Sequence, residues 1–245
     1  MTETPIQTRL STEQIEAFYH DEFVSDQVRD FAALVQSVRD GGVVVDMGGG
    51  CGFFAAGLKD RTGWRTRVVD SDPGSIAACL QNGVEAVKGD ALAPIVAGDE
   101  DVVCFNLILH HLIGQSEGVT RNLQTKALAA WHGRARAVFV NEYIYQSYVG
   151  TVSGWLIYQI TSSRLLSWIG ARVATVVPSF KANTFGIGVR FRAHEEWHRL
   201  FADAGYKVTD IRIGAAEHIS FPLRSLLIRT IRRDSFLIEP VGRPS

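Results

Sequence analysis

The sequence VVVDMGGGCGFF at residues 43–54 joins a short apolar run to a cluster of glycines. A continuous apolar run such as Val43 to Met47 is typical of a central strand of a parallel sheet, buried on both faces. The glycines that follow let the backbone turn tightly into a helix and let a ligand lie against it without meeting a β-carbon. Open α/β sheets bind ligands beyond the carboxyl ends of their strands. The segment therefore predicts a nucleotide-like cofactor at this turn.

Apolar strands and helical stretches alternate along the chain after this turn. Strands are expected at 43–47, 66–70, 84–88, 102–109 and 136–142, and helices at 52–60, 74–81 and 120–132. Such alternation implies right-handed crossovers and a parallel sheet covered by helices on both faces.

Near the carboxyl terminus, a helix at 194–204 precedes strands at 207–213 and 225–233. The last two strands have no helix of clear periodicity between them, so they are expected to form an antiparallel pair at one edge of the sheet. The predicted fold is a doubly wound, mostly parallel, seven-stranded α/β sheet of the Rossmann-like type.

The composition limits the class of partner. The 245 residues, 46% hydrophobic, suffice for one large domain or a core with a cap. A net charge of -1 gives no general attraction to nucleic acid or to an anionic membrane surface, so the substrate must be sought in local features. Cys51, Cys79 and Cys104 lack the spacing of a zinc site or a disulfide framework. The first ten residues do not resemble a secretory signal, and a cytoplasmic protein is expected.

A carboxylate closes the strand after the glycine turn. Asp70 follows Gly48 by 22 residues, and at that position it can accept hydrogen bonds from both hydroxyls of an unphosphorylated ribose. This feature suits NAD as well as S-adenosylmethionine.

Four segments in order resemble the motifs of the class I S-adenosylmethionine-dependent methyltransferase superfamily. DMGGGCG at 46–52 is similar to its acidic Gly-x-Gly-x-Gly motif, and DSDP at 70–73 to the acidic end of its second strand. GDAL at 89–92 resembles the adenine-contacting turn, and DVVCFNLILHHL at 101–112 the fourth strand with its His-His-Leu. The resemblance covers residues 40–142 well, and it implies S-adenosylmethionine as the cofactor.

The resemblance also implies a role for each matching residue. The glycines would line the cofactor, with Asp46 near its amino-acid end, Asp70 on the ribose, Asp90 on the adenine amino group and Asn106 offering backbone oxygen to the ammonium. The implied cofactor-binding set is Asp46, Gly48, Gly49, Gly50, Gly52, Asp70, Ser71, Asp90, Ala91 and Asn106.

Methyl transfer needs a base only where the acceptor carries a proton when it attacks. His111, His110 and Glu142 are the catalytic candidates because they follow the fourth and fifth strands at the edge where the methyl group should lie. Adjacent histidine side chains diverge, so at most one should face the substrate, and His111 is favoured. The alternative for all three is a structural role. No spaced carboxylate set indicates a metal, and none is expected.

The stretch 143–190 breaks the alternation and is interpreted as an apolar helical cap. Polar interruptions argue against a membrane-spanning helix, which needs about 20 mostly apolar residues. The chain thus divides into an N-terminal helical segment contributing to the cap (1–40), a cofactor-binding core (41–142), the cap (143–190) and a C-terminal part completing the sheet (191–245). The residues expected in the substrate pocket are Tyr143, Trp155, Tyr158 and Arg190.

Alternatives for the cap remain open at this level. Its aromatic residues, which include Phe180 and Phe185, can line an acceptor pocket, or can be core or dimer contacts, and a second subunit could complete so apolar a cap as a homodimer. Arg190 and Arg192 can pair with an acidic substrate group or form a solvated strand face.

The function expected from these features is methylation of a small organic acceptor, such as a secondary metabolite, at oxygen, nitrogen or carbon. An NAD-dependent oxidoreductase would share the glycine turn and Asp70 but leaves 89–92 and 101–112 unexplained. A noncatalytic protein with the same fold, docked to a membrane through 151–177, is the third reading.

Overall fold

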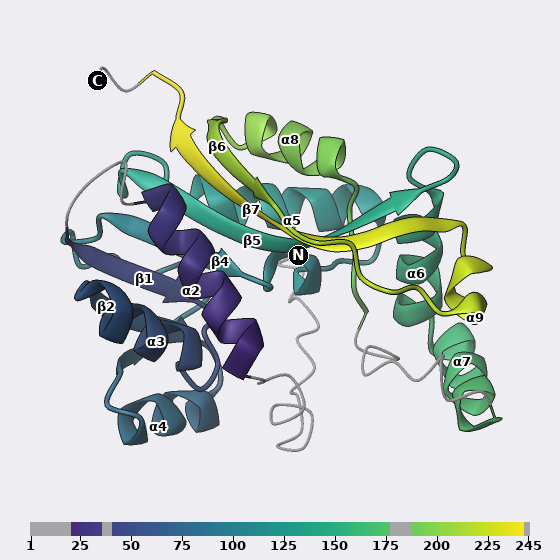
Figure 1. Ribbon diagram of the computed structural model, residues 1–245, viewed down its shortest axis with the longest axis horizontal. Helices are drawn as coiled ribbons and strands as arrows, with labels where there is room; N and C mark the ends of the chain where they lie inside the picture. The colour runs from purple at the N-terminus through teal and green to yellow at the C-terminus, as the bar shows by residue number, and fades with distance from the viewer. Residues whose placement is uncertain (1–20, 36–40, 177–187, 243–245) are drawn as a thin grey trace.

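The glycine-rich segment lies at the centre of a seven-stranded sheet in the computed structural model, which describes residues 21–35, 41–176 and 188–242 (Figure 1). The strands are β1 (Val43–Met47), β2 (Arg65–Asp70), β3 (Glu85–Lys88), β4 (Val102–Asn106), β5 (Ala137–Ser147), β6 (Tyr206–Ile213) and β7 (Ile228–Pro240). Their order across the sheet is β3-β2-β1-β4-β5-β7-β6. The chain thus winds outward from β1 in one direction through β2 and β3, and in the other through β4 and β5, which confirms the doubly wound prediction.

The pairing of the strands is parallel from β3 to β5 and antiparallel on both sides of β7. The antiparallel part therefore lies at one edge, as expected. Three strand boundaries were wrong: β4 ends at Asn106 rather than at 109, β5 runs to Ser147 rather than ending at 142, and β7 covers 228–240 rather than 225–233. Strands β5 and β7 are long because they pair with each other, from Val138 against Ile238 to Ser147 against Ile228.

The helices are α2 (Asp21–Val35), α3 (Phe53–Thr62), α4 (Pro73–Gln81), α5 (Glu117–Ala129), α6 (Val152–Ser162), α7 (Arg164–Val176), α8 (His194–Asp203) and the short α9 (Phe221–Arg224), with a 3₁₀ turn η1 (Leu109–His111). Local sequence fixes several of their starts. Asp72 caps α4 by accepting a hydrogen bond from Ser75 N, with Pro73 next in line, and Ser116 caps α5 through Val119 N.

Two apolar layers hold the helices to the sheet. On one face, α2 and α3 pack Phe31, Leu34 and Leu58 against the buried side chains of β1, β4 and β5. The described part of the N-terminal segment thus covers the sheet, and α2 packs against α3 (Figure 1).

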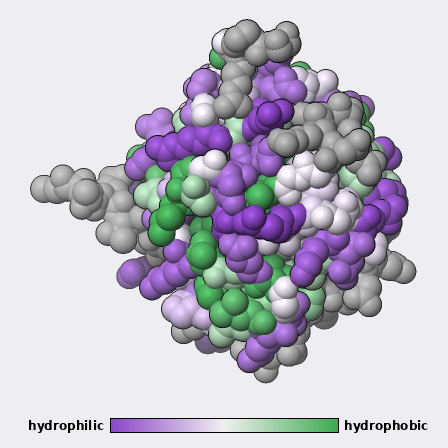
Figure 2. Space-filling view, turned by 90° about the vertical axis from the view of Figure 1, so that its left-hand side faces the viewer, coloured by the Kyte–Doolittle hydropathy of each residue, from purple (hydrophilic) through white to green (hydrophobic). Residues whose placement is uncertain are grey.

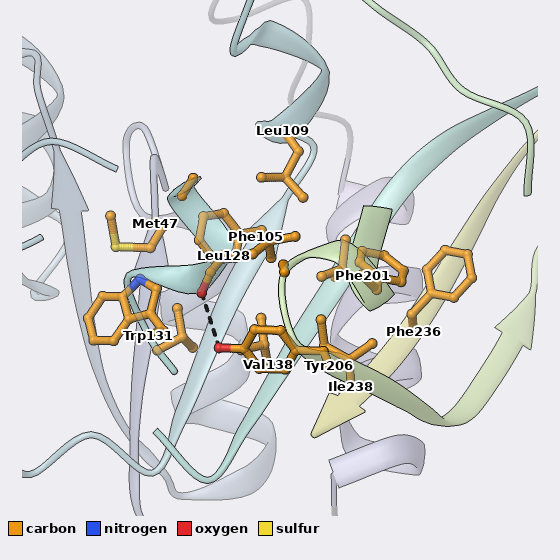
Figure 3. Close-up of a cluster of buried hydrophobic side chains, with 14 of the residues drawn as sticks. Met47, Phe105, Leu109, Leu128, Trp131, Val138, Phe201, Tyr206, Phe236 and Ile238 are labelled. Atoms are coloured by element: carbon orange, nitrogen blue, oxygen red, sulfur yellow. Dashed lines mark hydrogen bonds between the residues drawn. The ribbon is translucent and has the colours of Figure 1, made fainter. Parts of the chain in front are cut away.

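On the other face, α5 and α8 bury Leu128, Trp197 and Phe201 against the same strands. Figure 3 shows Leu128 and Phe201 within this layer. Tyr206 extends this layer, and its hydroxyl donates a hydrogen bond to Leu128 O at 3.1 Å. With both faces covered, the carboxyl edge of the parallel strands is where their loops can form a site.

Helices α6, α7 and α9 lie together at one end of the molecule, on the right in Figure 1. Helix α6 packs against β5 and α7, and its Ile157 joins Leu223 and Leu226 around α9 in a separate small apolar cluster. Within the described residues, no helix is both long enough and apolar enough to cross a membrane.

Candidate active site

The turn after β1 requires glycine at alternate positions. Gly48, Gly50 and Gly52 have φ angles of 68°, 54° and 80°, in the left-handed region that other residues adopt at a cost. A β-carbon on Gly48 would also lie 1.8 Å from Ile108 Cδ1, in the loop after β4. The alternating glycines therefore bring the loops after β1 and β4 into contact at the point where the strand order reverses.

Gly49 and the start of α3 complete this loop. A β-carbon on Gly49 would lie 2.3 Å from Asp46 Oδ2, so only glycine leaves that carboxylate its space. Gly52 caps α3 without any side-chain acceptor, and a helix N-terminus of this kind offers backbone N–H groups that a ligand can use.

Asp46 is a buried carboxyl group that receives no hydrogen bond from the described residues. It is 1% exposed, and neither of its oxygens has a hydrogen-bond partner among the described residues. Burial, and secondly the neighbouring Asp70 carboxylate, raise the pKa of Asp46 to about 8. The residue at the acidic position of the motif is therefore mainly protonated in this state at neutral pH.

Asp70 closes β2 beside the glycine loop. Its carboxylate accepts hydrogen bonds from Gly50 N at 3.1 Å and from Asp72 N at 2.8 Å. Burial raises its pKa, although these backbone donors and that of Ser71 act in the opposite direction. The side chain is thus fixed in orientation and keeps further acceptor capacity for a ligand.

The third and fourth loops contribute Asp90 and Asn106. Asp90 is exposed, and one of its oxygens accepts the N–H of Leu92 at 2.8 Å, while Ala91 is buried beside it. Asn106 donates to Gln27 Oε1 at 3.1 Å, and its own buried Oδ1 has no described partner. The ends of β1, β2, β3 and β4 therefore each bring an implied cofactor residue to the same edge of the sheet.

His110 and Glu142 form a buried pair that holds the 3₁₀ turn η1. Glu142 Oε2 lies 2.7 Å from His110 Nδ1, and its Oε1 accepts the N–H of Leu109 at 2.7 Å. The Glu142 side chain is 0% exposed. Since its oxygens already hold the turn, this arrangement matches the structural alternative for both residues.

His111 is placed differently. It is half-buried, its ring lies 4.2 Å from that of His110, and the ring makes no hydrogen bond to a described residue. Burial, together with His110, holds the pKa of His111 well below its usual value. His111 is therefore a neutral imidazole whose ring nitrogens make no hydrogen bond to a described residue.

The residues expected in the substrate pocket do not share one environment. Tyr143 lies near His110, with ring centroids 6.2 Å apart, and beside Phe191 at 5.8 Å. Tyr158 is buried, and its hydroxyl donates to Gly114 O at 2.8 Å, which ties α6 to the loop after η1. Trp155 is 46% exposed on α6. Of these three aromatic residues, Tyr143 is the one whose ring lies beside a catalytic candidate, while Phe180 and Phe185 lie outside the described residues.

Arg190, expected to face a substrate, is instead buried in an ion-pair cluster with Arg192. Glu117 accepts from Arg190 Nε at 2.7 Å and from Arg192 Nη1 at 2.8 Å, and Glu196 accepts from Arg190 Nη2 at 2.8 Å. Burial would raise the pKa of Glu117, but the two arginines outweigh it and hold the pKa below its usual value. Neither arginine forms a solvated strand face, because both are almost fully buried.

Comparisons with known proteins agree with this arrangement. The family model described as methionine biosynthesis protein MetW matches residues 28–113, about a third of the chain. A search of curated protein sequences finds no match. An S-adenosylmethionine-dependent methyltransferase from Clostridium acetobutylicum ATCC 824 is similar in structure with a TM-score of 0.56 and 10% identity, over 94% of this chain and 96% of that one.

Two further solved structures are similar to this chain. Magnesium protoporphyrin IX methyltransferase from Synechocystis PCC 6803 gives a TM-score of 0.54 at 12% identity, over 94% of this chain and 89% of that one. Mitomycin 7-O-methyltransferase gives 0.55 at 14% identity, over 89% of this chain. The chain has the class I methyltransferase fold. It spans 53% of the length of the mitomycin enzyme, so the similarity there covers about half of that protein.

Two residues at the site, Gln27 and Ile108, make contacts that the sequence pattern did not predict. Gln27 reaches from α2 to Asn106 and also donates to Asn141 Oδ1 at 3.4 Å. Ile108 occupies the space that the absent β-carbon of Gly48 leaves. Both act across long sequence separations, and neither a helical glutamine nor an apolar loop residue belongs to a local pattern that would predict this.

Proposed function

We propose that this chain binds S-adenosylmethionine at the carboxyl edge of β1 to β4 and transfers its methyl group to a small organic acceptor. The observation that carries the proposal is the glycine loop, where three left-handed glycines turn the backbone between Asp46 and Asp70 at the switch in strand order. Doubly wound sheets bind nucleotide-like ligands at this position. Two of the similar structures are described as bound to S-adenosylmethionine or S-adenosylhomocysteine, which supports the choice of cofactor.

The residues present fit such a cofactor. Asp46 and Asn106 each keep buried oxygens without a described partner, and an unpaired buried polar atom is costly unless a ligand satisfies it. The cofactor carries a cationic sulfonium and an ammonium group, so it would stabilise the ionised form of Asp46. The unpaired acceptor oxygens and the glycine loop therefore suit a cationic nucleoside.

Each loop would contribute one kind of contact. Asp70, already oriented by Gly50 N and Asp72 N, would accept hydrogen bonds from the ribose hydroxyls. Exposed Asp90 would accept one from the adenine amino group. Asn106 would offer its backbone oxygen to the ammonium group. The cofactor supplies an electrophilic methyl group, and the chain supplies its orientation, which can account for much of the acceleration.

We assign the proton-accepting role, where the acceptor needs one, to His111. A neutral imidazole can take a proton at the moment of attack, and the depressed pKa of His111 keeps it neutral at physiological pH. His110 and Glu142 act as positioning residues, because their hydrogen bonds fix the turn that carries His111.

The acceptor we propose is a small organic molecule rather than a nucleic acid. The near-neutral net charge supplies little attraction for phosphates. The mitomycin, protoporphyrin and geranyl diphosphate methyltransferases among the similar structures are named for small organic acceptors. A place in secondary metabolism and a cytoplasmic location belong to the same proposal.

The test is calorimetric titration of the chain with S-adenosylhomocysteine and with NAD, alongside Asp70→Asn. Asparagine keeps the size of the side chain and one acceptor oxygen but loses the charge, so affinity for S-adenosylhomocysteine should fall roughly 10- to 100-fold. Asp60→Asn is the matched control, since Asp60 is an exposed carboxylate on α3. Binding of NAD alone would favour the oxidoreductase, and binding of neither ligand would favour a noncatalytic protein.

A further inference from the structure

A row of polar residues runs across four neighbouring strands of the sheet. Asn106, the last residue of β4, lies opposite Asn141 of β5, which lies opposite Ser235 of β7. Arg212 of β6 lies opposite Ser235 in turn. Residues opposite one another on paired strands point to the same face of a sheet. The four side chains therefore form one line across the sheet, and the line begins at the site.

Two residues of α2 lie over this row. Gln27 Oε1 accepts a hydrogen bond from Asn106 Nδ2 at 3.1 Å, and Gln27 Nε2 donates to Asn141 Oδ1 at 3.4 Å. Asn141 Nδ2 donates to Ser235 Oγ at 2.7 Å. Ser235 Oγ donates to Asp30 Oδ2 at 3.0 Å. These five residues form a continuous series of hydrogen bonds, which is called the α2 relay below.

The α2 relay is buried between the helix and the sheet. On the face of the molecule seen in Figure 2, hydrophilic residues lie among hydrophobic ones and can contact water. Gln27, Asn141 and Ser235, by contrast, are only 3%, 2% and 0% exposed, so their polar atoms need partners within the protein. Among the buried side-chain oxygens and nitrogens of the relay, Asn106 Oδ1 is the one without a partner in the described residues.

The hydrogen bonds of the relay have a fixed direction because they end on Asp30. Its carboxylate lies 3.2 Å from Arg212 Nε and 3.7 Å from Arg29 Nη2. An ionised carboxylate accepts hydrogen bonds and cannot donate one. Ser235 must therefore give its single hydroxyl proton to Asp30 and receive a hydrogen bond from Asn141.

The same direction passes along the relay to Asn106. Because Asn141 turns its nitrogen to Ser235, its oxygen faces Gln27 and accepts from the Gln27 nitrogen. The Gln27 oxygen is then left to accept from Asn106. In the reverse direction Ser235 would donate to Asn141, and two oxygens 3.0 Å apart at Asp30 would have no proton between them. Asn106 therefore commits its nitrogen to Gln27 and keeps its oxygen for another donor.

A second unpaired acceptor lies on the same face of the sheet. Asp46 of β1 lies opposite Cys104 of β4, two residues before Asn106, and residues two apart in a strand point to the same face. Asp46 and Asn106 both keep buried oxygens without a described partner. Two such acceptors at the switch in strand order suit a cationic group with several N–H donors, such as a primary ammonium.

We propose that α2 sets the direction of the Asn106 amide, so that its oxygen faces the ammonium group of the bound cofactor. Gln27 and Asp30 are then positioning residues, which act through Asn106 without touching the ligand. The inference rests on the proposed function and adds a side-chain contact to the backbone oxygen of Asn106. It also gives α2 a role in selecting a cation, because the amide nitrogen in the same place would repel one.

The experiment is calorimetric titration of the full chain with S-adenosylhomocysteine and with 5′-methylthioadenosine, which has the nucleoside and the sulfur but no ammonium or carboxylate group. Gln27→Met removes the acceptor that holds the Asn106 nitrogen. Its affinity for S-adenosylhomocysteine should fall roughly 10-fold, while that for 5′-methylthioadenosine should not change. Gln27→Glu keeps an acceptor oxygen for Asn106 and should not lose affinity for S-adenosylhomocysteine.

A second variant acts from the other end of the relay. Asp30→Leu removes the carboxylate that fixes the direction, so it should also lower the affinity for S-adenosylhomocysteine and leave that for 5′-methylthioadenosine unchanged. Asp26→Leu is the matched control, because Asp26 is an exposed carboxylate on the same helix and lies outside the relay. Asp30 is partly exposed, so this pair of variants decides the question even where Gln27→Met does not fold.

A control on the other face of the sheet separates binding from stability. Tyr206→Phe removes one buried hydrogen bond, to Leu128 O. It should lower the free energy of unfolding, measured with denaturant, and leave the ratio of the two affinities unchanged.

Three results would overturn the inference while leaving the proposed function intact. They are equal losses of affinity for both ligands, full affinity for S-adenosylhomocysteine in folded Gln27→Met, and a selective loss in Gln27→Met that Asp30→Leu does not share. If the unchanged chain does not bind S-adenosylhomocysteine, the proposed function and this inference both fail.

Discussion

Replacing Asp46 with asparagine should remove a specific pH dependence of stability. The carboxyl is 1% exposed and has no described hydrogen-bond partner, and its pKa rises from 3.8 to about 8 on folding. Because the folded pKa lies above the unfolded one, the unfolded chain loses this proton first as pH rises. The free energy of unfolding then falls by about 1.4 kcal/mol per pH unit across the window from about pH 4 to about pH 8.

Between pH 5 and pH 7 the free energy of unfolding of the unchanged chain should therefore fall by about 2 to 3 kcal/mol relative to that of Asp46→Asn. Asparagine has nearly the same shape and cannot ionise, so any fixed cost of the amide shifts its curve without changing this difference. The assay is urea unfolding followed by tryptophan fluorescence at pH 5, 6 and 7. Asp60→Asn, at an exposed carboxylate of α3, serves as the control. Parallel stability curves for the unchanged chain and Asp46→Asn would refute the reasoning.

The same carboxyl gives a signature of cofactor binding that rests on the proposed function. A cationic ligand beside Asp46 would lower its pKa, so binding near pH 7 should release up to roughly one proton. Calorimetric titration with S-adenosylmethionine in two buffers of different ionisation enthalpy measures that release, and Asp46→Asn should abolish it.

Three further substitutions test other parts of the site. Left-handed backbone strain costs about 1–2 kcal/mol, and Gly48→Ala should destabilise the chain by more than that because its β-carbon would clash with Ile108. Gly63→Ala, at a φ of 72° with open space around it, should cost only the strain. The free energies of unfolding of the two variants are compared by denaturant unfolding. Glu142→Ala leaves His110 and backbone N–H groups of η1 without their acceptor and should cost about 3 kcal/mol in the same assay. His111→Gln should lower the methylation rate of a protonated acceptor by roughly 10²- to 10⁴-fold. Because the pKa of His111 is depressed, the rate of the unchanged enzyme should stay flat from about pH 8 down to about pH 6, and a loss near pH 6.5 would contradict its assignment.

The positions of the residues in the proposed cofactor half of the site could be predicted from sequence because local backbone rules define them. Gly48, Gly50 and Gly52 occur where the turn needs left-handed residues, and Asp70 ends a strand that the apolar pattern already marks. Each of these features lies within one strand and the turn beside it. Their relative placement then follows from the parallel winding of the sheet.

The surroundings of the proposed acceptor half could not be predicted in the same way, because pairs of residues far apart in the sequence define them. The pattern around Phe191 left Arg190 and Arg192 open to a substrate or solvent, yet both are held by Glu117, more than 70 positions earlier. The extension of β5 to Ser147 depends equally on β7, about 80 residues later. No local periodicity carries such information.

Long-range hydrogen bonds also tie segment 190–192 and α6 to the surroundings of η1, the turn that carries His111. Arg190 N donates to His110 O at 2.9 Å and Tyr145 N donates to Arg192 O at 3.0 Å, so segment 190–192 is bonded to both η1 and β5. The hydroxyl of Tyr158 bonds Gly114 O and ties α6 to the loop that follows η1. A displacement of α6 would therefore reach the loop after η1 through the hydrogen bond between Tyr158 and Gly114. The turn that carries His111 is thus tied to elements outside the parallel strands, whereas the glycine loop lies at the centre of the sheet.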